Sequence, residues 1–181
     1  MTTPRADVRA IALTGPMGSG KSAVGRALAR ALGWPFVDAD EAIVERAGKP
    51  IAAIFADSGE AAFRQLERET IADLLEQRPL VLALGGGAFL DPETRARCLA
   101  PGCLSVYLAT RPETSWRRIR AGNGPARPLL QVDDPLEQLR SILEQRRPLY
   151  EQAHLTVCTD ERSVPELVRG ILERAGIGHR R

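Results

Sequence analysis

A glycine-rich segment near the N-terminus has the residue types and spacing of a phosphate-binding loop. Residues 15–22 read GPMGSGKS, which fits the pattern G-x-x-x-x-G-K-[ST]. Glycines let successive backbone N–H groups surround a phosphate, and the helix that follows directs the positive end of its dipole at the anion. A lysine and a hydroxyl at the end of the pattern can neutralise phosphates and bind Mg²⁺. A chance glycine-rich turn is the alternative to this nucleotide site, which we assign to Gly18, Ser19, Gly20, Lys21, Ser22 and Ala23.

A pair of aspartates ends the next predicted strand, which reads FVDAD at 36–40. Residues two apart on a strand share a face, so Asp38 and Asp40 can both project from the carboxyl edge of a sheet toward the loop. One could hold metal-bound water while the other accepts the proton of an attacking hydroxyl. The competing interpretation is that Asp40 only caps the helix that follows.

Two arginines are placed where an anionic substrate could be recognised. Arg64 and Glu67 are three residues apart on a predicted helix, so Glu67 can orient Arg64, although the same spacing also gives ordinary surface ion pairs. Arg146 falls on the inward stripe of a later helix, where an unpaired cation is costly. It must meet a ligand carboxylate or an internal acid, or its stem must carry the charge to solvent.

Two further segments could contact a ligand. The strand at 80–84 runs into three glycines at 85–87, which either allow close backbone approach to a small ligand or make a sharp turn. Residues 111–130 hold five arginines and one glutamate, and AGNGP at 121–125 interrupts them. Near a phosphate site this segment predicts a lid that closes on the transferring phosphate, and a solvated helix and loop is the alternative.

The elements that must position these residues alternate between strand and helix. Candidate strands cover 9–14, 35–37, 80–84, 104–108 and 155–158. Candidate helices cover 20–32, 40–47, 51–56, 59–76, 92–99, 112–120, 135–152 and 164–175. This order predicts an α/β protein with three α/β/α layers, a central parallel sheet of about five strands and a mobile lid, with ligands beyond the carboxyl ends of the strands.

Length and composition limit the class of protein. The 181 residues predict one domain over 1–181, with the phosphate loop at 15–22, a substrate-binding segment at about 38–70 and the lid at about 117–130. The net charge of +2 argues against a dedicated nucleic-acid binder. Three cysteines without a C-x-x-C, no long apolar run and no signal-peptide pattern predict a cytoplasmic protein. We expect a monomer with no nucleic-acid or membrane partner.

The motifs taken together resemble the shikimate kinase family over nearly the whole chain. The matching segments are GPMGSGKS, FVDAD, IFADSGEAAFRQLE, GGG, RPLL and RRPLY, in the order that the family has them. The resemblance implies the P-loop NTPase fold, with ATP and Mg²⁺ as cofactors. It also implies phosphorylation of the 3-hydroxyl of shikimate, giving shikimate 3-phosphate and ADP, in the biosynthesis of aromatic amino acids.

The resemblance also implies roles for individual residues. Ser22 and Asp38 would hold Mg²⁺, Asp40 would bind the substrate hydroxyls and serve as general base, and Arg64 and Arg146 would clamp the carboxylate with Glu67 orienting Arg64. The remaining implied contacts are backbone contacts from Gly86 and Gly87, pocket walls from Phe55 and Phe63, a γ-phosphate contact from Arg127, and adenine contacts from Arg120, Arg162 and Pro165.

Two other functions fit parts of the sequence. A gluconate kinase-like enzyme would share the phosphate loop but has no need of Asp40, Arg64 and Arg146 together. A catalytically silent nucleotide-sensing module would tolerate damage at Lys21, Asp40 or Arg127, and all three are intact. Both alternatives therefore leave part of the motif set unexplained.

Overall fold

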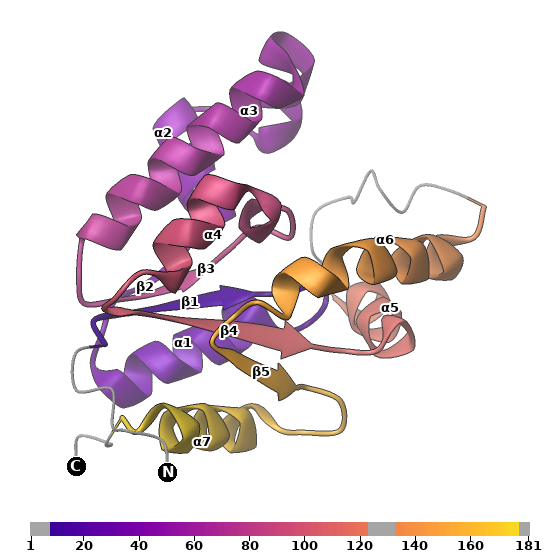
Figure 1. Cartoon of the computed structure of the whole chain (residues 1–181). Helices are drawn as coiled ribbons and strands as arrows, with labels where there is room; N and C mark the ends of the chain where they lie inside the picture. Colours follow the sequence, from indigo (N-terminus) through magenta and orange to yellow (C-terminus); the bar gives the residue numbers. More distant parts are fainter. Residues whose placement is uncertain (1–7, 123–132, 178–181) are drawn as a thin grey trace.

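The structure, a computed structural model, describes residues 8–122 and 133–177 and is built on a parallel sheet. Five strands lie in the order β2-β3-β1-β4-β5, and every neighbouring pair is parallel (Figure 1). The strands are β1 Ala10–Thr14, β2 Phe36–Asp38, β3 Leu80–Ala83, β4 Cys103–Ala109 and β5 Leu155–Cys158. The predicted parallel sheet of about five strands is confirmed.

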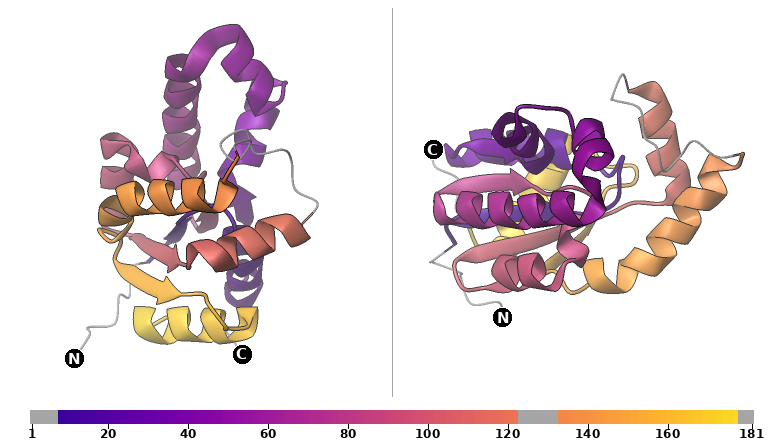
Figure 2. Two further views of the ribbon diagram at one scale, coloured as in Figure 1. Left: turned by 90° about the vertical axis from the view of Figure 1, so that its right-hand side faces the viewer. Right: turned by 90° about the horizontal axis from the view of Figure 1, so that it is seen from above.

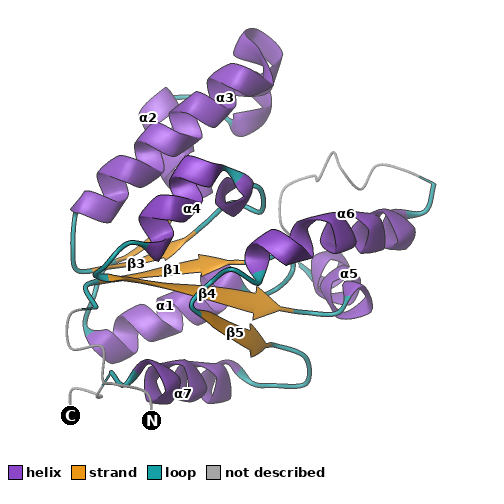
Figure 3. Cartoon of the chain, viewed as in Figure 1, coloured by secondary structure: helices purple, strands orange, loops and turns teal. Residues whose placement is uncertain are grey.

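Helices cover both faces of the sheet, so the predicted three-layer arrangement is also confirmed. α1 and α7 lie on one face and α3 and α4 on the other, while α5 and α6 extend beyond the strand ends (Figures 1 and 3). The helices are α1 Lys21–Leu32, α2 Ala39–Ala47, α3 Ile51–Glu76, the short 3₁₀ helix η1 Ala88–Leu90, α4 Pro92–Leu99, α5 Pro112–Ala121, α6 Pro135–Tyr150 and α7 Val164–Ala175.

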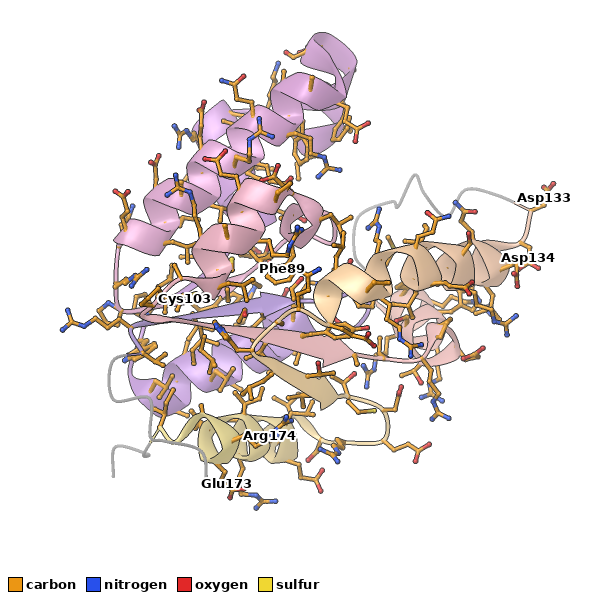
Figure 4. All side chains as sticks on the ribbon, viewed as in Figure 1. Phe89, Cys103, Asp133, Asp134, Glu173 and Arg174 are labelled. Carbon is orange, nitrogen blue, oxygen red and sulfur yellow. The ribbon has the colours of Figure 1, made fainter. Side chains whose placement is uncertain are left out.

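The core has two halves because the inner strands are apolar on both faces. Ile11 and Leu13 of β1 pack toward α1 and α7, while Ala10 and Ala12 face the opposite cluster. Phe89 of η1 is fully buried in that second cluster, between the sheet and α4 (Figure 4). Burial on both faces explains why these strands read as continuous apolar runs.

The predicted helix ends agree with the structure to within one residue except at the end of α6, where the difference is two residues. The helices predicted at 51–56 and 59–76 both lie in α3, and a backbone break at Gly59, with φ 79° and ψ 175°, divides this element at the predicted start of the second helix. Such a positive φ is accessible to glycine and strained for other residues. The helix predicted to reach residue 152 ends at Tyr150.

The carboxyl ends of the strands point toward α5 and α6 (Figure 1). The two helices pack against each other beyond this edge of the sheet, and α2 and α3 project together from its side (Figure 2). The loops that follow β1, β2 and β3 therefore open into the space where the sequence places the ligands. None of the described helices is long and apolar enough to cross a membrane.

Candidate functional site

A lysine at the start of α1 donates hydrogen bonds back to the loop between β1 and α1. Lys21 Nζ donates hydrogen bonds to the carbonyl oxygens of Gly15 (2.8 Å) and Pro16 (2.9 Å). Gly20 precedes α1 in the left-handed conformation, with φ 95°, and no side chain caps the helix. The first N–H groups of α1 therefore have no side-chain acceptor at the cap, which is the arrangement that suits an anion.

The two aspartates of FVDAD have different surroundings. Asp38 ends β2, accepts a hydrogen bond from Ser22 Oγ (2.9 Å) and caps α2 by accepting from the N–H of Asp40 (3.1 Å). Asp40 lies in the first turn of α2 and is not its cap. The prediction that both carboxylates project from one strand face is therefore wrong, because the strand stops at Asp38 and Asp40 already belongs to α2.

Asp40 and Glu67 both reach over Gly85. An ideal Cβ placed on Gly85 would lie 2.8 Å from Asp40 Oδ1 and 3.2 Å from Glu67 Oε1. The missing side chain thus makes room for two carboxylates. Glu67 is 3% exposed. Burial raises the pKa of Glu67, the hydrogen bond from Arg64 opposes this shift, and the charge of Asp40 adds to it.

Glu67 holds Arg64 against the glycine run. Arg64 Nη1 donates to Glu67 Oε2 at 2.8 Å, and Nη2 lies 3.5 Å from Glu60 Oε1. The same Nη1 would be 3.0 Å from a Cβ on Gly87. One partner of the Arg64–Glu67 pair is almost fully buried, so it differs from the ordinary surface ion pair that the spacing alone would allow.

Arg146 approaches the same glycines from α6. Its Nη1 donates to the carbonyl oxygen of Gly86 at 3.2 Å, and Tyr150 Oη donates to that oxygen at 2.5 Å. Within residues 8–122 and 133–177 the structure records no ion pair for Arg146, so the internal salt bridge that we considered is absent there. Arg64 and Arg146 thus lie beside neighbouring glycines, each with N–H groups left to bind an anion.

Two aromatic rings lie next to Arg64. The rings of Phe55 and Phe63 have centroids 4.6 Å apart and are tilted by 31°. Phe63 is buried, whereas Phe55 is 37% exposed. The Arg64 guanidinium carbon lies 5.2 Å from the centre of the Phe63 ring. The pair therefore forms an apolar wall beside the charged groups.

Comparison with known proteins identifies the family to which the chain belongs. The family model for shikimate kinase matches residues 17–175. The chain belongs to the shikimate kinase family. A shikimate kinase of Thermus thermophilus is 48% identical over 91% of this chain and 88% of its own length. One of Symbiobacterium thermophilum is 45% identical over 91% of this chain and 94% of its own.

Comparison with solved structures supports the same family assignment. A shikimate kinase from Acinetobacter baumannii in complex with shikimate is 40% identical, with a TM-score of 0.84 over 92% of both chains. A gluconokinase from Sinorhizobium meliloti is 24% identical over 94% of this chain and 92% of its own, with a TM-score of 0.59, and shares the fold alone. The predicted resemblance and the P-loop fold are confirmed, and membership of the shikimate kinase family makes the chain an ATP-dependent kinase.

The residues that the resemblance assigns to adenine are spread over two grooves. Arg120 is exposed, and its guanidinium carbon lies 5.9 Å from the centre of the Trp116 ring. It lines a groove between α5 and α6. Pro165 lines a different groove, between α1 and α7. Arg162 is exposed in the segment that precedes α7, and Ala23 is exposed on α1. Arg127 lies outside the described residues.

Two residues of this shikimate kinase family member contact the site although the sequence does not single them out. The apolar spacing predicts only a core role for Tyr150, yet its hydroxyl binds the Gly86 carbonyl. Arg118 is one of several arginines of the predicted lid at about 117–130, yet it donates to carbonyl groups of the P-loop. The tyrosine spacing, four residues after Arg146, gives a weak signal for the first, and nothing in the sequence distinguishes the second.

Proposed function

We propose that the chain transfers the γ-phosphoryl group of ATP to the 3-hydroxyl of shikimate, giving shikimate 3-phosphate and ADP, in the biosynthesis of aromatic amino acids. The observation that carries the proposal is the pairing of Arg64 and Arg146 at neighbouring glycines, with Asp40 over the preceding one. A substrate with one carboxylate and several hydroxyls needs this combination of groups.

The two arginines bind the carboxylate. A guanidinium offers two parallel N–H donors to a carboxylate, so a pair of them fixes both the position and the plane of the acid. Glu67 keeps Arg64 in place through the 2.8 Å hydrogen bond. The backbone of Gly86 and Gly87 completes the contact, and Phe55 and Phe63 line the pocket beside it.

Asp40 binds the hydroxyl that reacts. Its carboxylate accepts the proton of the 3-hydroxyl while the hydroxyl oxygen bonds to the γ-phosphorus. The bond from that phosphorus to the β–γ bridging oxygen breaks, and ADP leaves with the electron pair. No covalent enzyme intermediate is needed, because phosphoryl transfer depends on positioning and on neutralising charge.

The phosphate groups are held from the other side of the site. The backbone of Gly18, Ser19, Gly20 and Ala23, with Lys21, receives the phosphates, and Arg127 reaches the γ-phosphate. The meeting of Ser22 Oγ with Asp38 at 2.9 Å supports a Mg²⁺ site, since a hydroxyl and a carboxylate are suitable oxygen donors. Bound Mg²⁺ would neutralise charge on the phosphates. Arg120, Arg162 and Pro165 remain the proposed adenine contacts.

A coupled assay of ADP release tests the proposal. We expect turnover with shikimate and none with gluconate at the same concentration. Asp40→Asn should abolish turnover while nucleotide binding, measured by calorimetry, persists. Turnover with gluconate alone would refute the assignment, and unchanged turnover in Asp40→Asn would refute the role of Asp40 as base.

A further inference from the structure

The glycine run leads directly into η1, and the first hydrogen bond of this short helix is made to a glycine of the run. The N–H of Ala88 donates to the carbonyl oxygen of Gly85 at 3.1 Å. A trans peptide group carries its C=O and N–H on opposite sides. Because Ala88 holds the Gly85 carbonyl, the N–H of Gly86 is directed away from η1. This N–H belongs to the backbone that we propose for contact with the substrate carboxylate.

η1 is too short to hold its conformation alone. It spans Ala88–Leu90, and the N–H of Leu90 donates to the carbonyl oxygen of Gly87 at 3.1 Å. The first helical turn costs more conformational entropy than one hydrogen bond returns, and the hydrogen-bond geometry of a 3₁₀ turn is poorer than that of an α-helix. Other parts of the molecule must therefore stabilise η1. One of them is the packing of Phe89, which is fully buried between the sheet and α4 (Figure 4).

Arg95 of α4 stabilises the other end of η1. Its Nη1 donates to the carbonyl oxygens of Phe89 (3.1 Å) and Leu90 (3.0 Å). These are the last two carbonyl groups of η1, where a helix runs out of its own N–H donors. Arg95 is half-buried, and in the part of the chain that the structure describes it has no ion pair with a carboxylate. Its guanidinium is therefore committed to the end of η1.

The start of α4, from which Arg95 extends, is itself fixed. The carboxylate of Asp91 caps α4 by accepting from the N–H of Thr94 (2.8 Å), and it also accepts from Arg68 Nη1 of α3 at 3.3 Å. The N–H of Arg95 donates to the carbonyl oxygen of Asp91 at 3.0 Å. The corner between η1 and α4 is thus bound to α3, the helix that carries Arg64 of the proposed carboxylate clamp.

From this arrangement we propose that Arg95 is a positioning residue for the carboxylate of the substrate. It holds the end of η1, and η1 in turn holds the peptide group that carries the N–H of Gly86. The proposal deepens the proposed function and rests on it, since it assumes a carboxylate bound at the glycine run. Arg95 differs from Arg64 and Arg146 because it acts through the backbone and does not touch the substrate.

Steady-state kinetics of two variants test the proposal. Arg95→Met keeps an apolar side chain of similar length and removes both hydrogen bonds. The KM for shikimate should rise about tenfold, the equivalent of one hydrogen bond to a charged group, while the KM for ATP stays the same. The kcat should change little, because the carboxylate is bound equally in the ground state and the transition state. Arg95→Lys should lie between Arg95→Met and the parent protein, since a single nitrogen makes both bonds but the lysine side chain is shorter.

Amide hydrogen exchange, followed by NMR without substrate, provides a readout besides activity. In Arg95→Met the N–H groups of Ala88 and Leu90 should exchange about tenfold faster, because local opening of η1 becomes easier. The N–H of Ile171 in α7 should exchange at the parent rate. Unchanged exchange at Ala88 and Leu90 would overturn the proposal even if the KM for shikimate rises, since Arg95 would then not act through η1.

Arg97→Met is the matched control, because Arg97 lies two residues further along α4 on its surface, with only a 3.5 Å pair to Glu93 within the same helix. It should leave both KM values and the exchange rates unchanged. An unchanged KM for shikimate in Arg95→Met, with or without a lower melting temperature, would overturn the proposal. So would a parallel rise of both KM values, which is what a merely structural arginine would produce. Absence of shikimate-dependent turnover in the parent protein would instead refute the proposed function.

Discussion

Asp38 and Asp40 show how two identical side chains, two residues apart, come to do different work. Asp38 ends a strand, so its carboxylate meets Ser22 and caps α2. Asp40 is turned by the first helical residue toward Gly85, where Glu67 already lies. The Asp-x-Asp pattern predicted that both would be near the phosphate loop. It could not predict which one caps the helix, since that depends on where the strand stops.

Gly85→Ala tests the position of Asp40. The new Cβ would be 2.8 Å from Asp40 Oδ1, so the carboxylate must move. We expect kcat/KM for shikimate to fall about a hundredfold, which is the cost typical of a misplacement of about 1 Å in an active site. The melting temperature should change little. Steady-state kinetics and thermal unfolding provide the two measurements.

Gly170→Ala is the matched control for Gly85→Ala. A Cβ on Gly170 of α7 would meet no atom within 4 Å. Alanine in a helix interior is favoured over glycine by up to about 1 kcal/mol, so the melting temperature should rise by roughly 2–4 °C with activity unchanged. Activity loss of similar size in both variants would contradict the role given to Gly85.

The raised pKa of Glu67 predicts a pH dependence of substrate binding. Because burial raises this pKa, Glu67 loses its charge at a higher pH than an exposed glutamate does as the solution is acidified. A neutral Glu67 no longer holds Arg64 through a charged hydrogen bond, so the KM for shikimate should rise about tenfold through that pH range.

Glu67→Gln isolates this effect from other titrating groups. The KM of this variant for shikimate should already be high at neutral pH. Any further rise of its KM on acidification should occur at a lower pH than in the parent protein. The measurement is the KM for shikimate against pH in both proteins. Superimposable profiles would show that Glu67 does not control Arg64.

At the scale of elements, α6 contacts the glycine run through two side chains that are one helical turn apart. Arg146 and Tyr150 are four residues apart, and both donate to the Gly86 carbonyl. This carbonyl belongs to the peptide group that also carries the N–H of Gly87, so α6 sets the direction in which that N–H points. The helix and its inward face were predictable from the spacing of apolar residues. The carbonyl group that this face contacts was not predictable, because Gly86 lies 60 residues away from Arg146 in the sequence.

Tyr150→Phe tests the contribution of the tyrosine hydroxyl. The ring should stay stacked on Tyr107, at a centroid distance of 5.2 Å, while the hydrogen bond to Gly86 is lost. A hydrogen bond of this kind is worth about 1 kcal/mol, so the KM for shikimate should rise about fivefold with kcat little changed. Tyr107→Phe, which removes the neighbouring hydroxyl, should leave KM unchanged. Equal effects of the two substitutions would assign Tyr150 to packing alone.

Most element boundaries followed from local signals. Proline in the first turn of α4, α5, α6 and α7 and left-handed glycines after α1, α2 and α7 mark helix ends in the sequence itself. The break at Gly59 lies at the predicted start of a helix, whereas β2 begins and ends one residue later than predicted, because its limits depend on its pairing with β3. The contacts of Arg118 join residues up to 100 apart and leave no local pattern.

On the scale of the whole molecule, the two halves of the site are built from different segments. The proposed acid-binding half comes from α2, α3, the glycine run and α6. The proposed nucleotide half comes from the P-loop, α5 and the segment after β5. The hydrogen bonds that orient Arg64 and Arg146 come from Glu67 and from the Gly86 carbonyl, which both belong to the acid-binding half, so this half positions its own arginines.

Shikimate alone should therefore stabilise the protein. A ligand that binds the folded state at about a hundred times its Kd contributes about 2.7 kcal/mol, which corresponds to roughly 5–10 °C in melting temperature for a chain of this size. Thermal unfolding with shikimate and without nucleotide measures the shift. Arg146→Ala should remove most of it, since half of the carboxylate clamp is lost. If instead the parent protein is stabilised only when ADP is also present, the acid-binding half is not preformed, and nucleotide binding must organise Arg64 and Arg146.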